Sequence, residues 1–248
     1  REECSANRRN VLALELVRRR KSHMLENITS FLRNALYVVP AILISLTFHE
    51  FGHAYAAYKM GDPTARNLGR MTLNPLAHID PIGFILLVLF GFGWAKPVPI
   101  NTRYFKKPRR DMALSALAGP LSNILMSFAA FIASMYFFKY GCHDGFLNLE
   151  LTTDKIAYLF FLFLWMFYEM NLCLGVFNLI PIPPLDGSRI LFVFLPDKAY
   201  FGIMKYEQYI SIALIVGLWT GILSYPLSWL IGWIEQAFTF LVQFLPFL

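Results

Sequence analysis

The sequence contains few charged residues. Charged side chains make up 15% of its 248 residues and hydrophobic side chains 57%, whereas soluble domains average about 25% charged and about 45–50% apolar residues. The apolar residues gather in long runs, which is typical of a protein that crosses a membrane several times. Membrane orientation therefore explains the net charge of +6 better than nucleic-acid binding does, and we expect no nucleic-acid partner.

Cysteine is scarce as well. Cys4, Cys142 and Cys173 lie far apart and show no C-x-x-C spacing. The sequence therefore argues against a disulfide framework and against a thiolate metal site.

The distribution of charge predicts three regions. Residues 1–30 form a polar, basic segment, residues 31–195 a membrane core, and residues 196–248 a set of C-terminal membrane helices. The printed sequence begins with Arg, so residues 1–23 are either native or a non-native extension ahead of a natural start at Met24.

Five apolar runs approach the ~20 residues that a spanning helix requires. A sixth run, 82–94, has only 13 residues and three glycines, so it is too short to span comfortably. Proline and glycine around it predict extended or turning backbone, and we interpret 64–101 as a re-entrant segment. The predicted fold is an all-α polytopic membrane protein with five to six transmembrane helices and a small re-entrant β hairpin or sheet between the first two core helices. The five long runs are 34–58, 112–138, 156–180, 207–224 and 226–247.

Charge also predicts how the chain is oriented. The segment 96–111 holds six basic residues against one acidic residue, and basic loops tend to stay in the cytoplasm. The helix that follows then runs outward and the run 156–180 returns inward. If the segment 64–101 does not cross, His49 and Asp186 both lie toward the cytoplasmic side.

The most informative motif is H-E-F-G-H, formed by His49, Glu50 and His53 within an apolar run. Residues i and i+4 share one face of a helix, so the two imidazoles can bind one metal ion with the glutamate beside them as a base. The alternative is that the histidines only hydrogen-bond neighbouring helices. That alternative explains the glutamate poorly, because charged groups at membrane depth are rare and usually functional.

A catalytic zinc site needs a third protein ligand, and the sequence offers Asp186. It lies in N-L-I-P-I-P-P-L-D-G, where the prolines end the preceding helix and can aim a carboxylate back toward the membrane. The alternative is an ordinary interfacial Asp-Gly turn. The predicted topology favours the ligand, because it places Asp186 on the same side as His49.

These motifs together resemble those of the site-2 protease family of intramembrane zinc metalloproteases. H-E-F-G-H is followed by A-G-P-L-S-N at 118–123 and by N-L-I-P-I-P-P-L-D-G at 178–187. The segments L-N-P-L-A-H-I-D-P-I-G and G-W-A-K-P-V-P-I-N resemble compact bacterial members. The resemblance covers about residues 40–195 and is to a minimal form without PDZ or CBS domains.

The resemblance implies a set of residue roles. One Zn²⁺ per chain would be held by His49, His53 and Asp186. Glu50 would be the general base that activates the water on zinc and passes its proton to the leaving amine. Asn123 and Asn178 match family asparagines near the site and, as neutral donors, would be suited to holding an oxyanion or an unwound substrate backbone. Hydrogen bonding between helices is the alternative for both.

A helical substrate must be unwound before it is cut, and its freed amides need new partners. An exposed strand edge provides them by strand addition, and the candidates are Lys96, Pro97 and Val98, in the stretch 96–100, or the stretch 73–76. The alternative is that these residues only plug the cavity and admit water.

The predicted function is therefore hydrolysis of peptide bonds within or near transmembrane helices. The expected substrate is a single-span or signal-peptide-like membrane protein, and we expect the enzyme in the bacterial cell (inner) membrane with its site toward the cytoplasm. The alternatives are a metal-ion transporter and a catalytically silent membrane chaperone that uses the same polar residues. No internal repeat of the ligands, as a transporter tends to show, is visible.

Overall fold

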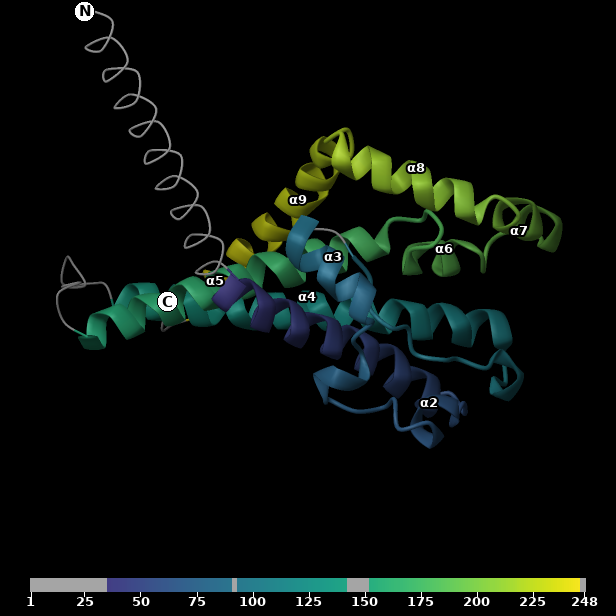
Figure 1. The fold of residues 1–248 in the computed structure, drawn as a ribbon, viewed down its shortest axis with the longest axis horizontal. Helices are drawn as coiled ribbons and strands as arrows, with labels where there is room; N and C mark the ends of the chain where they lie inside the picture. The colour runs from purple at the N-terminus through teal and green to yellow at the C-terminus, as the bar shows by residue number, and fades with distance from the viewer. Residues whose placement is uncertain (1–34, 91–92, 142–151, 246–248) are drawn as a thin grey trace, which may run out of the picture.

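A computed structural model of the chain describes residues 35–90, 93–141 and 152–245. The predicted 1–30 segment thus lies outside the described residues. The described part is almost entirely helical (Figure 1). In chain order its helices are Ala35–Lys59, α2 Thr64–Asn67, η1 Pro75–Ala77, α3 Pro81–Phe90, η2 Thr102–Tyr104, α4 Pro108–Gly141, α5 Thr152–Leu179, α6 Asp186–Leu191, α7 Asp197–Met204, α8 Glu207–Trp219 and α9 Ser224–Val242.

Three described helices are long and apolar enough to span a membrane: Ala35–Lys59, Pro108–Phe138 and Tyr158–Leu179. The pair α8 and α9 meets the same test jointly but is bent by 81°. The chain is therefore an integral membrane protein with three or four candidate spans among its described residues.

The prediction of five to six spanning helices is not confirmed. α3 has ten residues, or about 15 Å at 1.5 Å per residue, roughly half of the hydrocarbon thickness. The two C-terminal apolar runs form helices of 13 and 19 residues that meet at the sharp bend. The predicted runs meet at residue 225, close to the observed break between Trp219 and Ser224, but neither run forms a straight spanning helix by itself.

The predicted β hairpin is not confirmed either. Among the described residues there is no strand, only an isolated antiparallel bridge between Ile79 and Ala95. Pro97 and Pro99 follow the bridge and have no N–H to extend a ladder. Between the bridged residues, Pro81 begins α3, and the Asp80 side chain accepts a hydrogen bond from the Gly83 N–H (2.8 Å), as a helix N-cap does.

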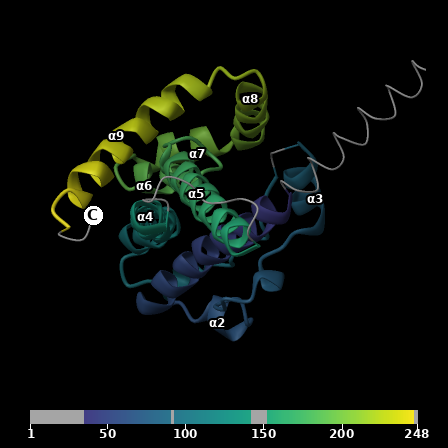
Figure 2. The same cartoon turned by 90° about the vertical axis from the view of Figure 1, so that its left-hand side faces the viewer.

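α4 and α5 pack side by side along most of their lengths and form the centre of the molecule (Figures 1 and 2). α8 and α9 lie on one side of this pair, and the Ala35–Lys59 helix lies on the other. Three buried aromatic residues join α4, α5 and α9: Phe131 lies 5.2 Å from Tyr168 and 6.0 Å from Phe238 between ring centroids. This packing fixes the relative positions of the helices that carry the buried polar residues.

The Ala35–Lys59 helix approaches α4 closely because a glycine faces it. A Cβ on Gly52 would lie 2.8 Å from the Ala118 carbonyl oxygen, which is too close for any other residue without movement. The Ser122 hydroxyl donates to the Phe48 carbonyl (3.0 Å). Small residues that let helices approach are typical of membrane interfaces, and here they turn the histidine face of the helix toward α4.

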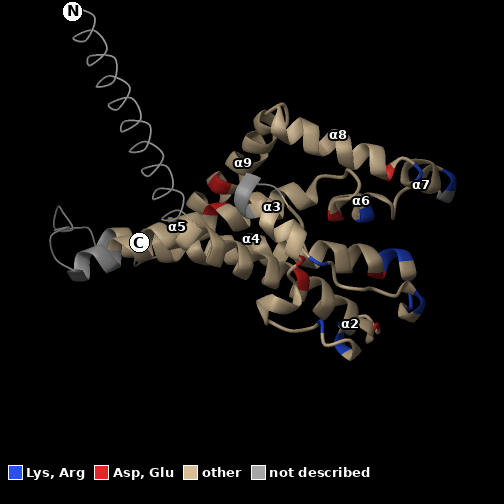
Figure 3. Cartoon of the chain, in the orientation of Figure 1, with Lys and Arg blue, Asp and Glu red and all other residues tan. Residues whose placement is uncertain are grey.

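Lys and Arg residues of the described part gather at one end of the molecule, in α2, at the beginning of α4 and in α7 (Figure 3). At this end the Ala35–Lys59 helix finishes and α4 begins. The positive-inside tendency favours a cytoplasmic location for this end.

Candidate metal centre

His49 and His53 project from one face of the Ala35–Lys59 helix, and each ring is held by its Nδ1 atom. His49 Nδ1 lies 2.6 Å from Asn123 Oδ1, and His53 Nδ1 lies 2.7 Å from the carbonyl oxygen of Ser115. Both partner oxygens accept hydrogen bonds, so each Nδ1 carries the proton and donates. In the neutral imidazole this leaves a lone pair on each Nε2.

The orientation of Asn123 is set by its surroundings. This side chain is fully buried, and its amide nitrogen donates to the Ser45 carbonyl (3.0 Å) and to Asn171 Oδ1 (2.9 Å). Its oxygen must therefore face His49. Asn171 in turn donates to the Phe167 carbonyl (2.8 Å), so three helices take part in orienting the His49 ring.

Gly119 makes room for the His53 ring. A Cβ at this position would lie 2.3 Å from His53 Nε2 and 2.4 Å from its Cε1. The Ser115 hydroxyl also donates to the His53 carbonyl (3.2 Å). The segment A-G-P-L-S-N thus has a structural explanation, since Gly119, Ser122 and Asn123 all contact the Ala35–Lys59 helix.

Asp186 reaches the site because the chain turns sharply after α5. The turn is hydrogen-bonded from the Leu185 N–H to the Ile182 carbonyl (2.9 Å), and α6 begins at Asp186. A Cβ on Gly187 would lie 2.2 Å from the Leu179 carbonyl oxygen, so the glycine of L-D-G allows α6 to begin against the end of α5.

The three side chains converge on one point. Asp186 Oδ2 lies 3.1 Å from Nε2 of His49 and 3.1 Å from Nε2 of His53, and the two Nε2 atoms are 3.0 Å apart. The side chains are largely buried. With both imidazole protons on Nδ1, all three atoms direct lone pairs toward one point, where a bound cation would hold them together. Two imidazoles and one carboxylate are the donors of a catalytic zinc site, and this arrangement fits such an ion.

Glu50 lies beside this cluster and is also buried. Its Oε2 accepts a hydrogen bond from the Val98 N–H (2.8 Å), which comes from the segment that follows α3. The predicted strand edge therefore lies directly over the glutamate, 48 residues away along the chain.

The other predicted residues are placed differently. Asn178 donates to the Leu174 carbonyl of its own helix (3.0 Å), and none of the metal-facing atoms is among its hydrogen-bond partners in the described part. The N–H of Lys96 donates to the His78 carbonyl (2.9 Å), and Pro97 has no N–H. The amides of Lys96 and Val98 are thus used within the chain, and strand addition at this stretch would use carbonyl oxygens.

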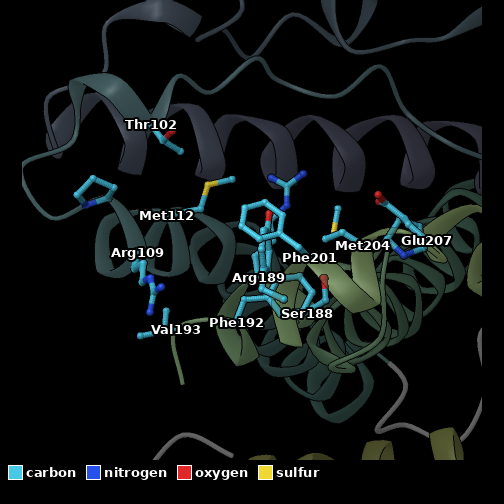
Figure 4. A pocket seen from close by; sticks show the side chains of 13 residues that line it. Thr102, Arg109, Met112, Ser188, Arg189, Phe192, Val193, Phe201, Met204 and Glu207 are labelled. Carbon is cyan, nitrogen blue, oxygen red and sulfur yellow. The ribbon is translucent and has the colours of Figure 1, made fainter. Parts of the chain in front are cut away.

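A cavity of about 330 Å³ opens beside the Asp186 turn, at the basic end of the molecule. Side chains from α4, α6 and α7 surround it, among them Met112, Arg189 and Phe201 (Figure 4). Pro184 and Ser188, two residues either side of Asp186, are part of its lining.

Sequence reasoning missed several contacts of the cluster. Asn171 was not predicted to take part, although a buried asparagine in an apolar helix is a signal for a polar partner. The Ser115 carbonyl and the Val98 amide are backbone groups, which no residue pattern identifies.

A helical membrane protein with two buried histidines, a carboxylate and an adjacent glutamate belongs by its chemistry to the membrane metallopeptidases. Comparison with known families agrees: the model of peptidase family M50 matches residues 37–223. The chain belongs to peptidase family M50, the site-2 protease family.

Individual relatives are informative as well. The chain is 41% identical over 191 residues to YwhC of Bacillus subtilis, covering 77% of this chain and 84% of the relative. It is 28% identical over 204 residues to Rip2 of Mycolicibacterium smegmatis, covering 80% and 72%. It is 31% identical over 144 residues to MJ0611 of Methanocaldococcus jannaschii, covering 58% and 63%. The name of each describes a candidate zinc metalloprotease. No solved structure matches the chain significantly.

Proposed function

We propose that this chain is a zinc-dependent endopeptidase that hydrolyses peptide bonds within or near transmembrane helices of membrane-protein substrates. The observation that carries the proposal is the convergence of His49 Nε2, His53 Nε2 and Asp186 Oδ2 within 3.0–3.1 Å. Membership of a peptidase family and zinc metalloprotease names among its relatives support the identity of the ion and of the reaction.

His49, His53 and Asp186 would hold the ion. When bound, zinc supplies Lewis-acid chemistry: it polarises the scissile carbonyl and brings the pKa of a coordinated water near ~7. Glu50 is placed to accept a proton, because a carboxylate has about four acceptor positions and the Val98 N–H takes one of them. The same carboxyl then passes the proton to the leaving amine.

Asn123 serves this chemistry through His49. Its two amide protons are already donated, to Ser45 and Asn171, so we propose that it fixes the His49 tautomer. Asn178 remains a candidate for holding an unwound substrate backbone. Lys96, Pro97 and Val98 remain candidates for a substrate edge through their carbonyl oxygens, because a carbonyl oxygen has two lone pairs and those of Lys96 and Pro97 give only one each to Arg70.

We further propose that cleavage takes place in the cytoplasmic half of a bacterial inner membrane. His49 lies ten residues before Lys59, or about 15 Å at 1.5 Å per residue, and the basic end of the molecule lies beyond Lys59. The substrate would be a single-span or signal-peptide-like membrane protein.

The test is to incubate the purified chain in lipid nanodiscs with a single-span test protein, next to Glu50→Gln. The wild type is expected to cut the test protein, to lose activity with a zinc chelator and to regain it with added Zn²⁺. Glu50→Gln should keep its zinc and lose about 10²–10⁴-fold in rate, the usual contribution of a general base. Metal flux into vesicles without any cleavage would instead support the transporter alternative.

A further inference from the structure

The segment 95–101, here called the strap, is fixed to the rest of the chain at several points around Glu50. At its centre, the Val98 N–H donates to Glu50 Oε2 (2.8 Å). At its end, the Asn101 N–H donates to the fully buried Asp62 (2.7 Å). The Val98 side chain is itself buried and packs with Ala54 and Ala65, so the strap is anchored by its centre as well as by its end.

The composition of the strap makes Val98 its natural donor. Pro97 and Pro99 have no N–H, and each proline restricts the residue before it to extended backbone. Lys96 and Val98 therefore lose little further conformational freedom when the strap is in place. The single N–H between the two prolines is the one that meets Glu50.

Arg70 closes the strap from the outside. Its guanidinium donates to the Lys96 carbonyl (2.7 Å) and reaches the Pro97 carbonyl (3.3 Å). The Pro97 carbonyl belongs to the same peptide unit as the Val98 N–H, and the Lys96 carbonyl belongs to the unit before it. Arg70 follows α2, and the turn at Gly61 links α2 to the Ala35–Lys59 helix. Arg70 therefore connects the strap to the helix that carries Glu50.

We propose that the strap positions the Glu50 carboxylate for proton transfer through the Val98 amide, and that Arg70 is the positioning residue that holds the strap. A hydrogen bond from a fixed backbone amide selects one orientation of a side chain that otherwise has several rotamers. One carboxylate oxygen is then engaged by the amide, and the orientation of the second oxygen is fixed with it. This inference rests on the proposed role of Glu50.

The contact itself can be observed without any catalysis. The dipeptide Pro-Val occurs once in the chain, at 97–98. Labelling with ¹³C-carbonyl proline and ¹⁵N-valine therefore gives a single amide resonance in a carbonyl-filtered NMR spectrum, that of Val98. We expect this resonance to lie downfield, as for an amide bound to a carboxylate, and to move upfield in Glu50→Gln, whose acceptor is neutral. A resonance that is unchanged in Glu50→Gln would overturn the proposal.

The role of Arg70 is tested by Arg70→Ala against the matched control Arg66→Ala. Arg66 belongs to α2 and contacts the Tyr58 hydroxyl and ring. Arg66→Ala therefore removes one positive charge, as Arg70→Ala does, but removes no contact with the strap. We expect Arg70→Ala to lower kcat about tenfold, equivalent to about 1.4 kcal/mol, with KM and zinc content unchanged and the Val98 resonance shifted. Arg70→Lys should recover part of the rate.

Three results would contradict this assignment: an unchanged kcat in Arg70→Ala, an equal loss in Arg66→Ala, or a faster reaction in Arg70→Ala. The last would mean that the strap obstructs Glu50. A wild type that cuts no substrate would refute the proposed function, whereas the NMR result would still report on the strap.

Discussion

Each imidazole of the cluster is constrained on the side away from the metal-facing atoms. A carbonyl oxygen from Ser115 and an amide oxygen from Asn123 fix the proton on Nδ1. Such partners determine the tautomer and the ring orientation of metal-binding histidines. The affinity of the site is therefore expected to depend on residues that never touch the ion.

Gly119 gives the sharpest test of this arrangement. Gly119→Ala introduces a Cβ that would lie 2.3 Å from His53 Nε2, so the ring must move away from the other donors. We expect the purified variant to lose most of its zinc and its activity. Gly232→Ala on α9, where a Cβ meets nothing within 4 Å, should behave like the wild type. Full zinc content in Gly119→Ala would show that the ring is not placed as described.

Asn123 should raise the affinity of the site for zinc, because it orients the His49 ring. Asn123→Ala removes the acceptor of the His49 Nδ1 proton, and loss of such a partner typically lowers metal affinity about 10–100-fold. Competition with a chromogenic zinc chelator measures this change. Ser127→Ala is the control, because its buried hydroxyl on the same helix donates to the Tyr168 carbonyl (3.0 Å) and not to the histidines. Equal affinities in the two variants would argue against the role of Asn123.

At the scale of elements, the apolar runs predicted the three long helices to within a few residues. α4 begins at Pro108, four residues before the run, because the Asp111 carboxylate accepts the Lys107 N–H (2.9 Å) and stabilises the polar first turn. α3 was missed because the three glycines of 82–94 argued against a helix and the Asp-Pro before the run was interpreted as turning backbone. Prolines that do not break a helix, such as Pro120 inside α4, are equally hard to interpret from spacing.

The cluster was more predictable than the elements around it. The i, i+4 spacing determines that His49 and His53 share a face, and the charge pattern placed Asp186 on their side. The strap could not be predicted, because its contacts are made by backbone groups whose position depends on tertiary packing. Asn123 was expected near the site, but its role depends on neighbours that a single sequence does not reveal.

The link between α5 and α9 can be tested on its own. Tyr168→Phe removes the hydroxyl that donates to Glu235 (2.7 Å), and membrane hydrogen bonds of this kind contribute about 0.6 kcal/mol on average. We expect a lower unfolding midpoint in a detergent titration of Tyr168→Phe than of the wild type. Tyr158→Phe, at a more exposed position on the same helix, should leave the midpoint unchanged. Identical midpoints for all three proteins would mean that this contact adds nothing to stability.

At the scale of the whole molecule, the basic end defines an orientation. α4 begins among Lys and Arg residues (Figure 3), and the positive-inside tendency favours an orientation in which it runs from the cytoplasm outward. We propose that the half of the molecule in which Asp186 meets the histidines faces the cytoplasm. A substrate helix would be cut near its cytoplasmic side.

This orientation predicts which positions can be labelled. In a variant whose native cysteines are replaced by serine, Lys106→Cys should react with a membrane-impermeant maleimide in inside-out vesicles and not in intact spheroplasts. Asn148→Cys, in the loop predicted to face outward, should show the opposite pattern. Labelling of Lys106→Cys from outside would reverse the topology.

The central claim is that Asp186 binds the same metal ion as His53 and His49, which lie 133 and 137 residues before it in the sequence. The zinc content of the purified protein tests this claim most directly. Metal analysis should find about one zinc per wild-type chain, as expected for a three-ligand catalytic site. The content should fall to near zero in Asp186→Ala and stay at about one in the control Glu207→Ala. An Asp186→Ala protein that is folded and keeps its full zinc would contradict the account, because the carboxylate would then not be a ligand.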